Sequence, residues 1–210
     1  MTTATSVEQI SSAQYDRARH VLGRAFHDYP LMHYAMPDAE RRLRGTTALY
    51  GAILYDCLRY GSVYATDNVA AVACWLPPGT RVPGFLRQLR AGILGLPIGF
   101  GLRGTRRLLD YDKIAQRLHH EFAPESHWYL ASLGVEPDRQ RQGLGSRLLE
   151  PQLARADREG HPCYLDTHRE SNVRLYERHG FRVTWQGTAP GHPVTIWSMR
   201  RDVQGSVATG

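Results

Sequence analysis

Apolar side chains recur every three or four positions in several stretches of the chain, which is the spacing of amphipathic helices. On this spacing we expect helices over residues 7–27, 39–59, 144–159 and 171–179, and two helices within 83–122, where glycines and Pro97 interrupt the pattern. Ser11 or Ser12 lies near the cap of the first helix, and Asp38 is a candidate cap for the second. Gly180 would close the last helix, and a loop or short turn is expected through 31–38.

Other stretches are short, rich in β-branched and aromatic residues, and bounded by turn residues, which predicts strands. They are residues 62–66, 69–76, 127–135, 163–167, 181–187 and 193–199. The first two would form an antiparallel hairpin, and so would the last two. The strand–helix–strand unit that ends at 167 would supply the parallel part of the sheet, because such strands need a long crossover. The order of elements therefore predicts a mixed α/β domain.

The turn that joins strand 127–135 to the following helix contains Gly143 and Gly145. A turn of this kind leaves backbone N–H groups free at the positive end of the helix dipole, and the glycines leave room for a phosphate. Arg139, Arg141 and Gln142 add donors around the same opening. Two glycines would also serve a simple tight turn, so the interpretation as an anion site depends on a second motif downstream.

Two common phosphate loops do not fit this turn. A Walker loop needs a lysine directly after its glycines, and the single lysine of this chain, Lys113, lies elsewhere. A dinucleotide loop needs three glycines, as G-x-G-x-x-G. The sequence here is Q-R-Q-G-L-G, after V-E-P-D. It closely resembles the acetyl-CoA pyrophosphate loop of the GCN5-related N-acetyltransferase (GNAT) superfamily, whose signature is Q/R-x-x-G-x-G/A after such a strand.

The second motif is N-V-R-L-Y-E-R-H-G-F, residues 172–181. It resembles the GNAT pattern N-x-x-x-Y-x-x-x-G-F, and it places Asn172 and Tyr176 on one helix face. The resemblance implies that Asn172 hydrogen-bonds the pantetheine arm of coenzyme A and that Tyr176 is the general acid for the departing thiolate. A single tyrosine in a helix is usually a core residue, so the functional interpretation rests on the two motifs together.

The GNAT resemblance implies a central mixed, mostly antiparallel twisted sheet of about six to seven strands, flanked by helices and splayed between strands 4 and 5. Acetyl-CoA would lie in the splay, with backbone groups of Leu133 and Val135 pairing with the pantetheine arm. The implied cofactor-binding residues are Leu133, Val135, Gln140, Arg141, Gln142, Gly143, Leu144, Gly145, Ser146, Asn172 and Tyr176.

The group that removes a proton from the amine is less defined by the sequence. Asp166 is a possible base, and the alternatives are Asp28, Glu121, Glu125 and His127. Candidate substrate contacts are Asp28, Tyr29 and Trp75, and further aromatic candidates are Tyr34, Phe85 and Phe100. Taken singly, each candidate base is more typical of a surface charge or a hydrogen-bonded cap, and each aromatic residue is more typical of the core.

The resemblance implies an acetyl-CoA-dependent N-acetyltransferase in which a primary amine of a small molecule attacks directly. The segments A-F-H-D-Y-P, A-A-V-A-C-W and 128–183 resemble the antibiotic-modifying branch that includes puromycin N-acetyltransferase, so an antibiotic is a candidate acceptor. Two alternatives stay open, which are acetylation of a protein or peptide amine and a non-catalytic sensor of acyl-CoA.

Composition narrows the other possibilities. The chain has 210 residues, 42% of them hydrophobic and 22% charged, which suits a single acetyltransferase domain over 1–202 and a flexible C-terminal tail over 203–210. The net charge of +6 comes from scattered arginines, which argues against nucleic acid and agrees with a cofactor that carries phosphates. Histidine spacing gives no metal motif, so no metal is expected.

No apolar segment approaches the ~20 residues that span a bilayer, and the N-terminus lacks the pattern of a secretory signal. The three cysteines lie far apart and are expected to be reduced. We therefore expect a cytoplasmic protein without membrane contact, as a monomer or homodimer.

Overall fold

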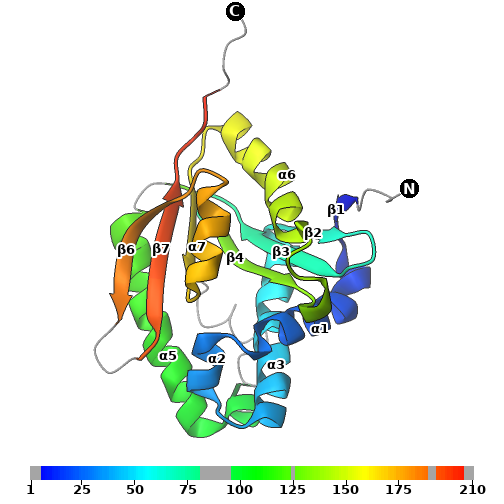
Figure 1. Ribbon diagram of the computed structural model, residues 1–210, viewed down its shortest axis with the longest axis vertical. Helices are drawn as coiled ribbons and strands as arrows, with labels where there is room; N and C mark the ends of the chain where they lie inside the picture. Colours follow the sequence, from blue (N-terminus) through cyan, green and yellow to red (C-terminus); the bar gives the residue numbers. More distant parts are fainter. Residues whose placement is uncertain (1–5, 81–95, 124–125, 189–192, 206–210) are drawn as a thin grey trace, which may run out of the picture.

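The computed structural model describes residues 6–80, 96–123, 126–188 and 193–205. Its strands form one seven-stranded sheet in the order β1-β2-β3-β4-β5-β7-β6, with helices packed against it (Figure 1). The strands are β1 (Val7–Gln9), β2 (Ser62–Thr66), β3 (Ala71–Leu76), β4 (Trp128–Val135), β5 (Cys163–Thr167), β6 (Arg182–Thr188) and β7 (Thr195–Arg201). The helices are α1 (Tyr15–His27), α2 (Pro30–Ala35), α3 (Ala39–Tyr60), α5 (Leu96–Phe122), α6 (Leu144–Glu159) and α7 (Glu170–Glu177).

The sheet confirms the predicted mixed topology of the GNAT fold. β4 and β5 are parallel, and the other neighbouring strands pair antiparallel. β4 and β5 pair only where they begin, through Trp128 with Cys163 and Tyr129 with Tyr164. Past these pairs the two strands separate, so the expected splay is present, and it leaves one side of the second half of β4 open.

Two groups of buried side chains cover the two faces of the sheet. One joins α1, α2, α3 and α5 to the sheet, and the other joins α6 and α7 to it. The sequence of β3 is almost continuously apolar because both faces of this strand are buried. Val72 and Cys74 belong to the first group of side chains, and Ala73 and Trp75 belong to the second. A strand that is buried on both faces has no polar side.

A β-bulge interrupts β4 beside the splay. Cys74 of β3 lies opposite Ser132, whereas the next residue, Trp75, lies opposite Leu130, so Ala131 is the extra residue. A bulge turns consecutive side chains toward the same face of the sheet, and bulges are common next to active sites. Here the bulge directs both Ala131 and Ser132 toward the face that α1, α3 and α5 cover.

The predicted element boundaries are mostly confirmed, with two differences. The expectation of helix from residue 7 is wrong at its start, because Val7–Gln9 pairs with β2 and a 3-10 turn at Ser12–Gln14 precedes α1. The expected loop over 31–38 is largely the short helix α2, which Pro30 begins. Within the described part of 83–122, α5 carries the expected break at Gly101.

α5 runs alongside β6 and β7 (Figure 1). At the C-terminal end, Asp202 forms an ion pair with Arg200 at 2.7 Å, and the backbone N–H of Gln204 donates to Asp157 at 2.8 Å. The rest of the predicted tail, 206–210, lies outside the described residues. In the part of the chain that the structure covers, none of the helices combines the length and apolarity that a membrane crossing requires.

Candidate active site

The loop between β4 and α6 opens onto the first of two cavities. Gly143, the residue before α6, has φ 79° and ψ 0°, a left-handed conformation that favours glycine. A Cβ placed on Gly143 would meet no described atom within 4 Å, so the loop is open on this side. α6 begins directly afterwards, and its first N–H groups and positive dipole end therefore lie at the cavity.

This first cavity has a volume of about 520 Å³ and gathers most of the predicted cofactor-binding residues. They are Leu133, Val135, Gln140, Arg141, Gly143, Leu144, Gly145, Ser146, Asn172 and Tyr176. Gln142 does not line the cavity, and its side-chain oxygen instead accepts a hydrogen bond from Arg139 Nε at 3.1 Å within the loop. The Val135 carbonyl, expected to pair with pantetheine, accepts from Gln140 Nε2 at 3.2 Å.

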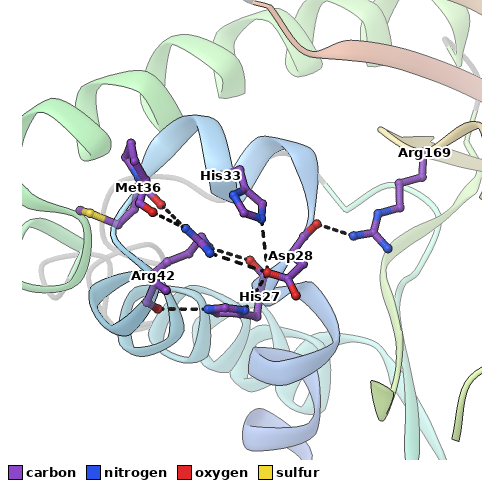
Figure 2. A network of polar contacts seen from close by, with 8 residues as sticks. His27, Asp28, His33, Met36, Arg42 and Arg169 are labelled. Atoms are coloured by element: carbon purple, nitrogen blue, oxygen red, sulfur yellow. Dashed lines mark hydrogen bonds and ion pairs between the residues drawn. The ribbon is translucent and has the colours of Figure 1, made fainter. Parts of the chain in front are cut away.

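The first cavity is electropositive. Its described lining contains no acidic residue, and it contains the four arginines Arg139, Arg141, Arg169 and Arg178. The guanidinium of Arg169 lies over the ring of Tyr29, 5.5 Å from its centroid, and donates to the backbone carbonyl of Asp28 (Figure 2). Arginines together with a helix N-terminus suit a ligand with several phosphates.

A chain of hydrogen bonds positions the α7 residues against β5. Asn172 Nδ2 donates to Thr167 Oγ1 at 3.2 Å, and the Tyr29 hydroxyl is bonded to the same oxygen at 2.9 Å. The backbone N–H of His168 donates to the Tyr29 hydroxyl at 2.8 Å. Tyr29, expected to touch the substrate, therefore holds the end of β5 and the start of α7 together.

The second cavity has a volume of about 270 Å³ and lies under α3 and α5. Its lining is mostly apolar and aromatic, and it shares Phe26, Tyr29, Leu133, Asn172 and Tyr176 with the first cavity. The two spaces therefore meet at these residues. Both residues turned by the β4 bulge, Ala131 and Ser132, line the second cavity.

Tyr176 stands at this junction and is buried, with 6% of its surface exposed. Its ring packs edge-on against Phe181, with the centroids 5.8 Å apart. Burial raises the pKa of the phenol well above its usual value of 10.0, and proximity to Tyr29 raises it further. The hydroxyl is therefore protonated throughout the neutral pH range.

Asp166 lies in the second cavity, and its two carboxylate oxygens differ. Oδ1 accepts from the Tyr164 hydroxyl at 3.0 Å and from the Ser198 hydroxyl at 2.7 Å. Oδ2 is buried and has no partner among the described residues. Burial raises the pKa of this carboxyl to about 6, although both hydroxyls act to lower it. At pH 7 the group is mostly ionised, with one oxygen left for a cation or a proton.

His168 and Tyr111 form a second polar pair in this cavity, which the sequence reading did not single out. His168 Nε2 and the Tyr111 hydroxyl lie 2.7 Å apart, while His168 Nδ1 is buried without a partner in the described structure. Burial lowers the pKa of His168 to about 3, so the ring is neutral at pH 7. The sequence offered a reason to consider His168, because His168 lies two residues after the candidate base Asp166 and side chains two apart along a strand share one face.

The structure places Asp28 away from both cavities. Its carboxylate, with 70% of the side chain exposed, pairs with His27 Nδ1 at 2.9 Å, His33 Nε2 at 3.3 Å and the Arg42 guanidinium at 3.7 Å (Figure 2). This network ties the end of α1 to α2 and α3. The expectation of Asp28 as a substrate contact is therefore not supported by its position. Asp28 instead links the end of α1 to α2 and α3 through its ion pairs.

Trp75 is a second correction. It is completely buried among the side chains between β3 and α6 and lines neither cavity, so it is a core residue. Phe100 is buried where α5 meets α3, and Tyr34 packs under the Arg107 guanidinium. Neither residue lines the two cavities. The remaining aromatic candidate, Phe85, lies outside the described residues.

The alternative bases lie outside the two cavities or outside the described residues. Glu121 is exposed on α5 and lines neither cavity. His127 Nε2 lies 2.6 Å from His119 Nε2, and the His127 ring lies beside the ring of Tyr164. Glu125 is not among the described residues. Across the described chain, no group of three or more His, Cys, Asp or Glu side chains is placed to hold a metal ion.

Comparisons with known proteins match the part of the chain that forms most of the first cavity. Residues 106–183 match the family model described as an acetyltransferase (GNAT) domain. An N-acetyltransferase from Schizosaccharomyces pombe is 25% identical over 188 residues, which cover 84% of this chain and 74% of the relative.

Solved structures extend the likeness to almost the whole chain. Arylalkylamine N-acetyltransferase 2 from Aedes aegypti has a TM-score of 0.67 at 17% identity, covering 96% of this chain and 100% of that one. An acetyltransferase from Corynebacterium glutamicum, related to histone acetyltransferase HPA2, also has a TM-score of 0.67 at 17% identity, covering 98% and 100%. At these identities the likeness shows the shared fold.

Proposed function

We propose that this protein, an acyltransferase of the GNAT type, transfers the acetyl group of acetyl-CoA to a primary amine of a small molecule by direct attack. The observation that carries the proposal is the junction of the two cavities at Leu133, Asn172 and Tyr176. The cavity on one side is lined by arginines, and the cavity on the other side is apolar with a buried carboxylate. An anionic donor and a cationic acceptor would therefore meet beside Tyr176.

The first cavity fits acetyl-CoA, which supplies the acetyl group as a thioester. Backbone N–H groups between Gly143 and Ser146, with the surrounding arginines, are suited to hold its pyrophosphate. The open side of β4 near Leu133 and Val135 offers backbone partners to an extended arm, as in the addition of a strand to a sheet edge. Asn172 is fixed on the opposite wall by Thr167.

Tyr176 and Asp166 divide the proton transfers between them. Tyr176 holds a proton at its phenolic oxygen at neutral pH, which a departing thiolate can accept. Asp166 takes the proton that an ammonium must lose before it can attack. Its pKa of about 6 makes it ionised at pH 7 and still close enough to that pH to act as a general base.

The alternative acceptors fit the second cavity less well. A volume of about 270 Å³ is at the small end for ligand sites, which favours a small molecule over a protein or peptide amine. A sensor of acyl-CoA would have less need for a buried phenol at the junction and a buried carboxylate in the adjoining cavity. The antibiotic acceptor, the cytoplasmic location and the monomeric or homodimeric state stay predictions from the sequence.

The test is release of coenzyme A from acetyl-CoA with a panel of amines that includes puromycin-like, aminoglycoside, polyamine, arylalkylamine and peptide examples. We expect turnover with at least one small amine and a loss of about 100-fold or more in kcat for Tyr176→Phe, with little change in acetyl-CoA affinity. Tyr55→Phe is the matched control, because Tyr55 is an exposed phenol on α3 outside both cavities. An unchanged rate in Tyr176→Phe would refute the acid role.

A further inference from the structure

The charge of the second cavity is opposite to that of the first. Its described lining contains two carboxylates, Asp112 and Asp166, and no lysine or arginine. The two acids are not equivalent, since Asp112 is exposed on α5 and its Oδ2 accepts from Gln116 Nε2 at 2.5 Å. The acid with an oxygen that has no partner among the described residues is Asp166.

A buried carboxylate oxygen without a partner is costly unless something else pairs with it. The hydroxyls of Tyr164 and Ser198 both donate to Asp166 Oδ1, and Oδ2 has no hydrogen-bond partner among the described residues. An ammonium would satisfy Oδ2, whereas a second anion in the same space would be repelled. The carboxylate therefore selects the charge of the ligand as well as accepting its proton.

The rest of the cavity selects an apolar body. Phe26 and Tyr50 stack with their centroids 3.9 Å apart and form an aromatic wall, while Leu49, Ile53 and Leu108 form an aliphatic wall from α3 and α5. Within about 270 Å³ these walls leave room for a ring and a short chain. The neutral His168–Tyr111 pair adds no positive charge to this lining.

We propose that the acceptor is a small apolar amine that carries no carboxylate, such as an arylalkylamine, with its ammonium paired to Asp166 Oδ2. The inference rests on the proposed function and specifies its substrate class. An amino acid would bring its own carboxylate into a cavity that has two acids and no described cation. Like charges forced together discriminate strongly between ligands. The second cavity therefore prefers amines without a carboxylate over the corresponding amino acids.

The test compares 2-phenylethylamine, phenylalanine and phenylalaninamide with the full-length enzyme and acetyl-CoA. The three share a ring and a primary amine, and the amide controls for added bulk without added charge. We expect kcat/KM for 2-phenylethylamine to exceed that for phenylalanine by at least about 100-fold, with phenylalaninamide between them.

Asp166→Asn separates charge selection from base catalysis. A base role alone would lower kcat/KM for 2-phenylethylamine and phenylalanine by similar factors, because their amines are similarly basic, whereas charge selection predicts that the ratio of phenylethylamine to phenylalanine falls by at least about 10-fold. If the variant is too slow to assay, the ratio of dissociation constants from calorimetry in the presence of coenzyme A gives the same comparison. Glu121→Gln, an exposed carboxylate outside both cavities, is the control.

The possible outcomes distinguish a failure of this inference from a failure of the proposed acetyltransferase function. Turnover of phenylalanine as fast as 2-phenylethylamine would overturn the inference and leave the proposed acetyltransferase intact. A ratio that Asp166→Asn does not change would also overturn it, because the charge of Asp166 would then play no part in selection. If no amine releases coenzyme A and none of the three compounds binds, both the inference and the proposed function fall.

Discussion

Replacing Asp166 by asparagine should make the protein more stable at alkaline pH while reducing acetyl transfer. Asparagine is nearly the same shape, and its Oδ1 can still accept from Tyr164 and Ser198. The substitution removes the negative charge of a buried carboxyl whose other oxygen has no described partner. Buried charges without a partner are unfavourable to folding, and functional sites commonly retain them.

The expected size follows from the pKa. The carboxyl has a pKa of about 6 in the folded protein and 3.8 as its ordinary value, so the folded state binds more protons between these values and stability falls as pH rises through them. At about 1.4 kcal/mol per pKa unit, the full difference is about 3 kcal/mol above pH 7. This is an upper limit on the gain, because the asparagine amide nitrogen also lies where Oδ2 has no partner.

The assay is urea unfolding of the wild type and Asp166→Asn at pH 8 and pH 4.5, followed by tryptophan fluorescence. The stability gap should widen by about 2 kcal/mol between pH 4.5 and pH 8, because the wild-type carboxyl is largely protonated in the acidic folded state. Glu121→Gln removes an exposed carboxyl and should show no comparable change. A gap that is independent of pH, or a variant that is less stable at pH 8, would refute the reasoning.

Three further substitutions test the supports of the site. Tyr29→Phe removes the hydroxyl that accepts the buried His168 N–H. It should lower the free energy of unfolding, measured by thermal unfolding, by about 1–3 kcal/mol and raise KM for acetyl-CoA. Unchanged values of both quantities would contradict this prediction. Gly143→Ala, at φ 79°, should cost about 1 kcal/mol and raise KM for acetyl-CoA more than it lowers kcat, as steady-state kinetics would show. Arg201→Ala breaks a bidentate pair with Asp157 at 2.7 and 2.8 Å and should cost about 2–3 kcal/mol at pH 7. Since Arg201 lowers the Asp157 pKa, that loss should shrink in urea unfolding below pH 4, and an equal loss at both pH values would refute it.

The residues that line the first cavity were predictable from sequence because the signals for them are local. Gly143 is needed for a left-handed turn, and the helix it introduces starts where the apolar spacing begins. Asn172 and Tyr176 share a face through simple helical spacing. Each of these inferences needs only a few consecutive residues, so no knowledge of distant contacts was required.

The second cavity needed the tertiary structure. Aromatic side chains are typical of cores and pockets alike, so the residue type of Trp75 alone did not place it. Its continuously apolar strand was in fact a signal of burial on both faces. Tyr111 meets His168 across a separation of 57 residues, which no local pattern reveals. The strand Val7–Gln9 was missed for the same reason, since it exists through its pairing with β2.

The two cavities draw unevenly on the chain. Residues 133–178, within the stretch that matches the GNAT domain model, supply most of the first cavity, whereas α2 and α3, which precede that stretch, line the second cavity alone. On the proposed function, substitutions in α2 and α3 would therefore alter which amine is accepted while the first cavity keeps its shape. A protein assembled in this way is well suited to acquire new substrates in small steps.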